Sequence, residues 1–387
     1  MAALYLHIPF CKSRCIYCGF YSTTQFSWQN RYVDALCREM LIRSRPQLGE
    51  VGGGLASVYL GGGTPSVLTK EQFRQIFGCI EKSYIYNKVY SLPSQQGGVG
   101  GGSEITIECN PDDVTDDFCE TLRQLPVNRI SMGAQTFDDG RLRFLRRRHS
   151  SGQICEAVRR LREAGFRNIS IDLMFGFPDE TLADWISDID HAIALDVEHV
   201  SAYSLMYEEG TALFELWKNG KIEKIDEEIS RQMYETLIDR LEVAGFDHYE
   251  ISNFAKSGFR SRHNSSYWNQ TPYIGIGAAA HSFDGKTRSW NVSDIGEYVA
   301  AIERGELPSE HEIIDETTRY NDLVTAALRT REGIFLPSLA PNFRDYLLEN
   351  AKKSLENNLL IVENDQIHLT RSGLFVSDDV LSDLIFV

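Results

Sequence analysis

The amino-acid sequence predicts an α/β protein: an open (β/α)6 partial barrel, followed by a smaller, mainly helical C-terminal domain that contains a short β-hairpin. Between residue 3 and about residue 210, six short apolar runs alternate with amphipathic helical runs. Six such units are fewer than the eight that close a TIM barrel, so we expect the barrel to be open. After about residue 210 the alternation stops, and helical patterns dominate from about residue 310.

The predicted strands and helices follow one another in regular βα order. The first strand is 3–10, and the helix after it is 28–41, where apolar residues recur at helical spacing. The second strand, 57–63, precedes a helix that Thr69 opens, with Gln72 three residues later in a capping-box pattern. Four more strands are predicted at 104–108, 128–134, 168–176 and 198–205, and three helices among them at 115–125, 151–164 and 181–194. Such apolar strands suit a parallel sheet covered by helices.

The second half of the chain lacks this regularity. A long amphipathic helix is predicted at 226–244, and the segment 251–290, dense in Asn, Ser, Tyr, Trp and His, is predicted to be irregular. Residues 357–373 predict two short strands around a turn. We therefore expect three parts, which are the barrel (1–225), the long helix and the polar-aromatic segment packing on the barrel (226–310), and the C-terminal domain (311–387).

A glycine-rich stretch and the overall composition limit the possible classes of protein. Residues 91–102, SLPSQQGGVGGG, have almost nothing apolar to bury, so we expect a mobile surface loop, to which we assign no function. The chain carries 39 basic and 55 acidic residues in 387, a net charge of −16. Such a surface argues against nucleic acid or anionic membrane as a default partner.

The sequence also predicts a cytoplasmic location. No apolar stretch approaches the roughly 20 residues that span a bilayer, and the N-terminus lacks a signal-peptide pattern, which leaves peripheral membrane contact open. Eight cysteines are too few for a disulfide scaffold in a chain of this length. We expect the five outside the first cluster to be small buried hydrophobic residues.

The strongest chemical signal is CKSRCIYC, which places Cys11, Cys15 and Cys18 on the loop directly after the first strand. Three thiolates on a short loop can ligate three irons of a [4Fe–4S] cubane and leave the fourth iron without a protein ligand. A structural zinc site is the alternative, but zinc needs four ligands, and His7 or Cys37 would have to supply the fourth. A redox dithiol is a further alternative.

Other polar or glycine residues stand at the ends of the predicted strands. Glycines in the run Gly61–Pro65 let the backbone approach a ligand, although a turn between strand and helix needs no ligand. Glu108, Gln135 and Asp172 lie at later strand ends, and ligands gather at the carboxyl ends of strands in α/β sheets. A buried acid is costly unless paired, so Asp172 is expected to face a ligand or an arginine, with a satisfied structural carboxylate as the alternative. The arginine run 141–148 is expected to be mostly a solvated helix face, with one member free to bind a carboxylate bidentately.

The segment 260–283 combines two histidines with Tyr267, Trp268 and Tyr273. Histidine is a common ligand of haem iron, and aromatic side chains stack on flat macrocycles. A packed, hydrogen-bonded histidine is the alternative interpretation.

Six segments together resemble the HemN/HemW branch of radical S-adenosylmethionine (SAM) proteins, and the resemblance runs from residue 3 to beyond residue 375. The segments are YLHIPFCKSRCIYCGF, GGGTP, IECNP, SMGAQTF, IDLMFGFP and HNSSYW. The resemblance implies a barrel of radical SAM type, and a [4Fe–4S] cluster that Cys11, Cys15 and Cys18 hold and whose open iron binds SAM. The positions that match SAM contacts in this family are Tyr5, Tyr17, Gly62, Gly63, Thr64, Glu108, Gln135, Arg147 and Asp172.

Two branches of that family imply two functions. Oxygen-independent coproporphyrinogen III dehydrogenases resemble CxxxCxxCxC, and here Phe20 stands in the place of the fourth cysteine. The segment 263–268, HNSSYW, is instead similar to the HNxxYW motif of the HemW branch, whose members are haem chaperones. The resemblance therefore implies haem as a further cofactor with His263 as candidate ligand, a haem-acceptor protein as partner, and an electron donor such as flavodoxin or ferredoxin. The alternative is a radical enzyme that decarboxylates the propionates of coproporphyrinogen III through a 5′-deoxyadenosyl radical.

Overall fold

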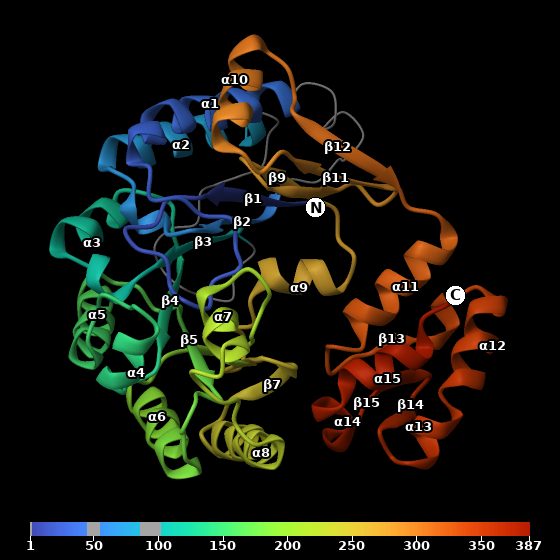
Figure 1. Ribbon diagram of the computed structural model, residues 1–387. Helices are drawn as coiled ribbons and strands as arrows, with labels where there is room; N and C mark the ends of the chain where they lie inside the picture. The colour runs from blue at the N-terminus through green and yellow to red at the C-terminus, as the bar shows by residue number, and fades with distance from the viewer. Residues whose placement is uncertain (1, 45–54, 86–101) are drawn as a thin grey trace.

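A curved sheet forms the centre of the molecule (Figure 1). The computed structural model describes residues 2–44, 55–85 and 102–387, so that the predicted loop at 91–102 lies outside the described residues except for Gly102. Within these ranges the sheet has twelve strands in the order β12-β11-β10-β9-β1-β2-β3-β4-β5-β6-β8-β7. Its six central strands run parallel, as predicted: β1 (Ala2–Ile8), β2 (Leu55–Gly62), β3 (Glu104–Cys109), β4 (Arg129–Gln135), β5 (Ile169–Phe175) and β6 (His199–Ser204).

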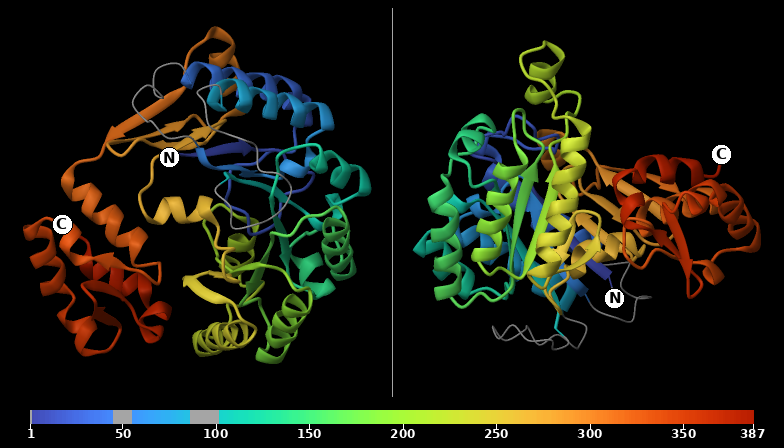
Figure 2. Two further views of the ribbon diagram at one scale, coloured as in Figure 1. Left: turned by 180° about the vertical axis from the view of Figure 1, so that it is seen from behind. Right: turned by 90° about the horizontal axis from the view of Figure 1, so that it is seen from below.

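Helices cover the outer face of this curved sheet (Figure 2). Six of them confirm the predicted helices to within two residues at each end: α1 (Gln29–Arg43), α2 (Lys70–Ile80), α3 (Asp116–Arg123), α5 (Ser151–Glu163), α6 (Leu182–Ala194) and α8 (Glu227–Val243). The predicted capping box at the start of α2 is present, with Thr69 and Gln72 each accepting from the other's backbone N–H. The short helix α7 (Ala212–Lys218) was not predicted, whereas α4 (Asp139–Phe144) covers the start of the arginine run that was expected on a helix face. The fold is therefore the expected α/β partial barrel.

The prediction of an irregular segment over 251–290 is wrong in part, because short strands within it extend the sheet at both edges. On one side of the barrel lie β7 (Asp247–Glu250) and β8 (Asn253–Ala255), and on the other β9 (Tyr273–Ile276), β10 (His281–Phe283), β11 (Thr287–Asn291) and β12 (Ser309–Ile313). The helices α9 (Arg262–Trp268) and α10 (Ile295–Arg304) interrupt them. Strand β9 pairs in parallel with β1, from Ala3 opposite Tyr273 to Leu6 opposite Ile276.

The C-terminal part has a hydrophobic core of its own, in which Val324, Leu347 and Leu384 are fully buried. It consists of α11 (Glu316–Ala327), α12 (Pro341–Asn350), α13 (Lys352–Glu356), α14 (Arg371–Phe375) and α15 (Ser377–Leu384). The predicted hairpin is confirmed as β14 (Leu360–Glu363) and β15 (Gln366–Leu369), to which β13 (Ile334–Phe335) adds a third antiparallel strand. The boundaries predicted at 225/226 and 310/311 stay predictions.

Two further sequence expectations can be placed on this fold. None of the helices in the described ranges combines the length and the apolar character needed to cross a membrane. Of the five cysteines expected to be buried, Cys37, Cys109 and Cys119 are buried and Cys79 is half-buried, but Cys155 is exposed. The expectation is wrong for Cys155 because its position on α5 faces solvent.

Candidate functional site

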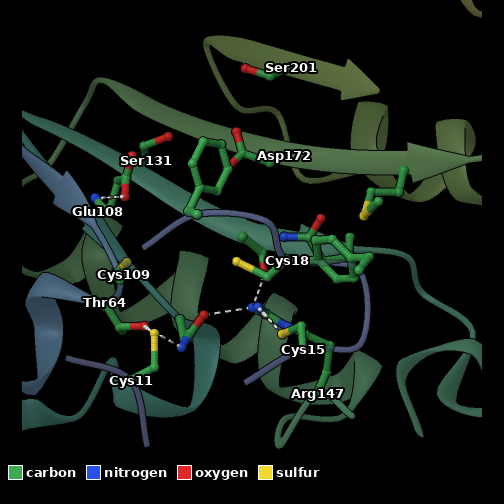
Figure 3. A pocket seen from close by; sticks show the side chains of 18 of the residues that line it. Cys11, Cys15, Cys18, Thr64, Glu108, Cys109, Ser131, Arg147, Asp172 and Ser201 are labelled. Carbon is green, nitrogen blue, oxygen red and sulfur yellow. Dashed lines mark hydrogen bonds between the residues drawn. The ribbon is translucent and has the colours of Figure 1, made fainter. Parts of the chain in front are cut away.

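The carboxyl ends of the parallel strands surround a cavity of about 560 Å³. The cysteine loop after β1 forms one side of it, and residues at the ends of the following strands form the other, with Glu108, Ser131, Asp172 and Ser201 on successive strands (Figure 3). Most of the predicted site residues line this one cavity: Cys11, Cys15, Tyr17, Cys18, Gly62, Gly63, Thr64, Glu108, Gln135, Arg147 and Asp172. Tyr5 and His263 are the two predicted site residues that do not.

Each thiol of the cysteine loop has a distinct environment. The Sγ of Cys11 lies 3.4 Å from the Thr64 hydroxyl, and the Arg147 guanidinium donates to the Sγ of Cys15 over 3.6 Å. Burial raises the pKa of the Cys11 and Cys18 thiols. None of the three is in a disulfide, so all three sulfur atoms are available as ligands.

The arrangement of these thiols fits an iron–sulfur cluster better than a single metal ion. Within the described residues, no three His, Cys, Asp or Glu side chains converge on a point that would hold one ion. The proposed fourth zinc ligands are also occupied elsewhere, since the His7 ring nitrogens contact the Tyr5 hydroxyl and the Tyr21 carbonyl, each at 3.0 Å, and Cys37 does not line the cavity. A zinc site would need His7 to leave these contacts or Cys37 to reach the cavity, whereas cubane ligands each bind a different iron and need no fourth protein ligand.

The glycine loop owes its residue types to close packing against the end of β1. The Gly63 N–H donates to the Ile8 carbonyl at 2.8 Å, and a Cβ on Gly63 would lie 2.7 Å from the carbonyl carbon of Pro9. Gly62 has a φ of +110°, and a Cβ there would lie 2.5 Å from the His7 ring. These contacts require glycine without any ligand, while the same backbone also lines the cavity. The loop therefore fixes the strand end from which the cysteine loop starts.

Two half-buried carboxyl groups line the cavity from β3 and β5. Glu108 accepts from the Tyr59 hydroxyl at 2.7 Å and from the Gly62 N–H at 3.1 Å, while burial raises its pKa. Burial, together with the negative charge of Glu108, raises the pKa of Asp172 to about 7. A ligand with hydrogen-bond donors or positive charge would stabilise the ionised form of both groups.

Arg147 is a member of the arginine run that lines the cavity and contacts the cysteine loop. Its guanidinium donates to the Asn110 side-chain oxygen and to the Gly133 carbonyl, both at 2.6 Å, as well as to Cys15. Gln135, buried beside it, has a φ of +69° at a register shift of β4, which turns the strand end toward the cavity. The expectation of a solvated helix face for the rest of the run is met only in part, because Arg143, Arg146 and Arg148 are exposed but α4 ends at Phe144, before Arg146 and Arg148.

The structure places His263 in a packed, hydrogen-bonded position, as in the alternative interpretation of this residue, and its role as a haem ligand stays a prediction. Its side chain is buried, its Nδ1 lies 2.9 Å from the Ser57 hydroxyl, and its Nε2 lies 3.0 Å from the Tyr267 hydroxyl. The ring stacks on Tyr59 with 4.8 Å between centroids, and burial lowers its pKa to about 3. Both ring nitrogens are occupied, so ligation by His263 would require this packing to open. Tyr5 adjoins the same group of rings and hydrogen-bonds with His7.

The comparisons with known proteins agree with this geometry. Residues 5–192 match the Radical SAM superfamily. The heme chaperone HemW of Bacillus subtilis is 34% identical, over 98% of this chain and 98% of the relative. The heme chaperone HemW of Lactococcus lactis is 31% identical, over 97% of this chain and 95% of the relative.

The chain belongs to the HemW family.

The fold of this HemW family member is also that of coproporphyrinogen III oxidase (HemN) from Escherichia coli, a radical SAM enzyme. Their structures superpose with a TM-score of 0.82 over 99% of this chain and 90% of HemN, at 21% sequence identity. This comparison establishes the shared fold. Membership of the radical SAM superfamily implies a [4Fe–4S] cluster and SAM as cofactors.

Several residues of the HemW cavity were missed by the sequence reasoning. Tyr59, Ser201, Tyr203 and Met206 line it, and Phe20, noted only as a missing cysteine, lines it as well. Tyr203 and Met206 lie at or just after the end of β6. Their position at a strand end was therefore the signal that would have identified them.

Proposed function

We propose that this protein is a haem chaperone that holds a [4Fe–4S] cluster and SAM in its cavity and binds haem for transfer to an acceptor protein. Cys11, Cys15 and Cys18 would hold the cluster, which supplies electrons to SAM when both are bound. The SAM-contacting residues would be the predicted residues that line the cavity. A protein such as flavodoxin or ferredoxin would supply the electron.

The carboxyl groups and Arg147 would position SAM from opposite sides. Glu108 and Asp172 offer acceptors for its amino and hydroxyl groups, and a bound cationic ligand would keep them ionised. Arg147 is fixed by Asn110 and Gly133, so its charge stays at the cysteine loop, beside Cys15.

The observation that carries the haem proposal is an apolar rim on the cavity, defined by Phe20, Tyr203 and Met206. These side chains line the cavity and yet are 73%, 42% and 64% exposed. Exposed aromatic and thioether groups suit a flat macrocycle, and a methionine thioether is a known type of haem-iron ligand. The cations Arg14 and Arg146 line the same cavity and offer partners for the two haem propionates.

Coproporphyrinogen dehydrogenase activity is the second candidate. It is favoured by the gathering of the three thiols and most of the predicted SAM residues in one cavity. Against it stands Phe20, which occupies the position of the fourth cysteine in that branch and lies exposed at the rim.

Haem titration followed by the Soret band tests the chaperone proposal. We expect wild-type protein to bind haem, and Phe20→Ser and Met206→Ala to weaken binding about tenfold each, the equivalent of about 1.4 kcal/mol, with the iron–sulfur absorbance unchanged. Val243→Ser is the matched control, because Val243 is also exposed but lies on α8 outside the cavity.

Three outcomes would contradict the proposal. Absence of haem binding by wild-type protein would refute the chaperone function. Equal loss in the Val243 control would mean that haem binds apolar surface without a defined site. Rapid SAM-dependent conversion of coproporphyrinogen III by the wild type would favour the dehydrogenase instead.

A further inference from the structure

The helices α1 and α2 pack side by side and are joined by polar contacts at regular intervals. Each helix follows a strand of the parallel sheet, so the two run in the same direction (Figure 1). Near their N-termini the Gln72 amide donates to the Asn30 side-chain oxygen at 2.8 Å. One turn further the Gln75 amide donates to Asp34 at 2.7 Å. This register predicts which residues meet at the next turn.

Two cysteines meet there. Cys37 lies three residues after Asp34 on α1, and its thiol reaches the Gln75 carbonyl over 3.8 Å. Cys79 lies four residues after Gln75 on α2, one helical turn beyond the carbonyl that the Cys37 thiol reaches, so the two thiols are neighbours. Neither cysteine lines the cavity, so the pair is separate from the candidate cluster site.

The two thiols differ in accessibility and acidity. Cys37 is buried and Cys79 is half-buried. The neighbouring Cys37 thiol lowers the pKa of Cys79 to about 7, with a smaller lowering by Lys82, while burial and the charge of Asp34 act in the opposite direction. A thiol that is partly accessible, partly ionised at neutral pH and next to a second thiol has the features of a redox-sensing cysteine with its resolving partner.

We propose that Cys37 and Cys79 are a peroxide-sensitive thiol pair, in which Cys79 reacts first and Cys37 closes a disulfide between α1 and α2. In the first step the Cys79 thiolate attacks hydrogen peroxide, an S–O bond forms, the O–O bond breaks and hydroxide leaves. In the second step the Cys37 sulfur attacks the Cys79 sulfenic acid, the S–S bond forms, and the S–O bond breaks to release water with the Cys37 proton. The two sulfurs together lose two electrons to one peroxide.

Such a disulfide would join two helices that follow the loops of the cavity. Helix α1 follows the cysteine loop and α2 follows the glycine loop, so these helices begin beyond the two segments that form one side of the cavity. A cross-link would join the two helices without using a side chain of the cavity.

Peptide mapping after peroxide treatment tests this proposal. Purified protein is treated with hydrogen peroxide at neutral pH, alkylated and digested with trypsin without reduction. Trypsin places Cys37 in the peptide 32–38, YVDALCR, and Cys79 in 75–82, QIFGCIEK. We expect these two peptides to become disulfide-linked, and the link to disappear after reduction with dithiothreitol.

Single variants separate the two roles. Cys37→Ser should leave a Cys79 sulfenic acid that dimedone traps, whereas Cys79→Ser should give neither link nor trapped Cys37. Cys155→Ser is the matched control, since Cys155 is more exposed than either and should not affect the link. If the wild type gave no linked peptide, or if Cys79 linked to another cysteine in preference to Cys37, the proposal would be refuted. These readouts do not depend on haem binding, so they stay independent of the proposed function.

Discussion

At the residue scale, the absence of a Cβ atom on Gly63 allows the close packing that positions the cysteine loop. At Gly63, backbone atoms of Ile8, Pro9 and Phe10 all lie within 2.9 Å of the place where a Cβ would be. These atoms belong to the chain immediately before Cys11 and cannot move aside as a flexible side chain would. A side chain at residue 63 would therefore displace the first of the candidate cluster ligands.

We predict that Gly63→Ala removes most of the cluster from the reconstituted protein, measured as iron per chain and absorbance near 400 nm. Gly78→Ala is the matched control, because a Cβ on Gly78 in α2 meets nothing within 4 Å. That substitution should leave iron content unchanged and stabilise the fold by about 0.5–1 kcal/mol, since alanine loses less backbone entropy in a helix. Full iron content in the Gly63 variant would mean that the loop can adapt.

The ligand assignment leads to a second prediction at this scale. Replacing Cys11, Cys15 or Cys18 singly with alanine should reduce the iron content from about four atoms per chain to a small fraction. Cys109→Ala is the demanding control, because this thiol also lines the cavity but burial raises its pKa well above the ordinary value. Equal iron loss in the Cys109 variant would show that the ligands are misassigned.

At the scale of elements, the predictability of each segment depended on how its residues are buried. The six parallel strands were predictable because a strand covered by helices must be apolar along its length, and β1 accordingly buries Leu4, Leu6 and Ile8. Strands β9 to β12 were missed because they are at most five residues long and carry half-buried or exposed polar and aromatic side chains. Of these strands only β9 pairs with β1, and β10, β11 and β12 follow outward from it, so the extension begins at a long-range partner that leaves no local pattern.

The site was predictable for a similar reason. Glu108, Gln135 and Asp172 were identifiable because strand ends converge in any parallel sheet. The role of His263 was not, since its hydrogen bonds reach Ser57 in β2, which is 206 residues away in the sequence. The motif therefore located the residue, and only the fold showed that its ring nitrogens are occupied.

One buried carboxylate joins α1 to the extension of the sheet. Glu39 is fully buried and accepts hydrogen bonds from Arg43 at 2.7 Å, from the Tyr298 hydroxyl at 2.6 Å and from the Gly277 N–H at 2.8 Å. Asn291 on β11 donates to it as well, at 2.8 Å. Helices α1 and α10 and strand β11 thus share one acceptor group.

We predict that Glu39→Ala lowers the free energy of unfolding by about 3–5 kcal/mol, because it leaves the buried Arg43 charge without its carboxylate. Glu303→Ala is the control, since the Arg31–Glu303 pair joins the same two helices but is exposed on both sides. That pair should contribute little because water screens it. Urea denaturation of both variants would decide, and similar losses would show that burial is not the source of the difference.

At the scale of the whole molecule, buried histidines determine how stability depends on pH. Burial lowers the pKa of His7 and His149 to about 4 and that of His263 to about 3, and lowers that of His199 well below its ordinary value. In the unfolded chain each of these groups takes up a proton near pH 6.5. The unfolded state therefore binds protons that the native state does not bind, and stability falls as the pH falls below 6.5.

Carboxyl groups with a raised pKa act in the opposite direction. Burial raises the pKa of Asp172 and of Glu180 to about 7, so below pH 7 the native state holds two protons that the unfolded chain lacks until near pH 4. Burial raises the pKa of Glu108 as well. Stability gained from these groups as the pH falls offsets part of the loss from the histidines.

We therefore predict that the slope of the free energy of unfolding between pH 6 and pH 5, measured by urea denaturation at several pH values, contains a separate contribution from each buried histidine. His263→Gln should reduce this slope by about 1 kcal/mol per unit, because it removes one group that titrates only on unfolding. Glutamine at this position keeps a hydrogen-bonding side chain opposite Ser57. A loss of stability that is equal at every pH would therefore come from changed packing and not from a changed titration. An unchanged slope in this variant would mean that His263 is protonated in the native state, and that its ring nitrogens are less firmly held than their contacts indicate.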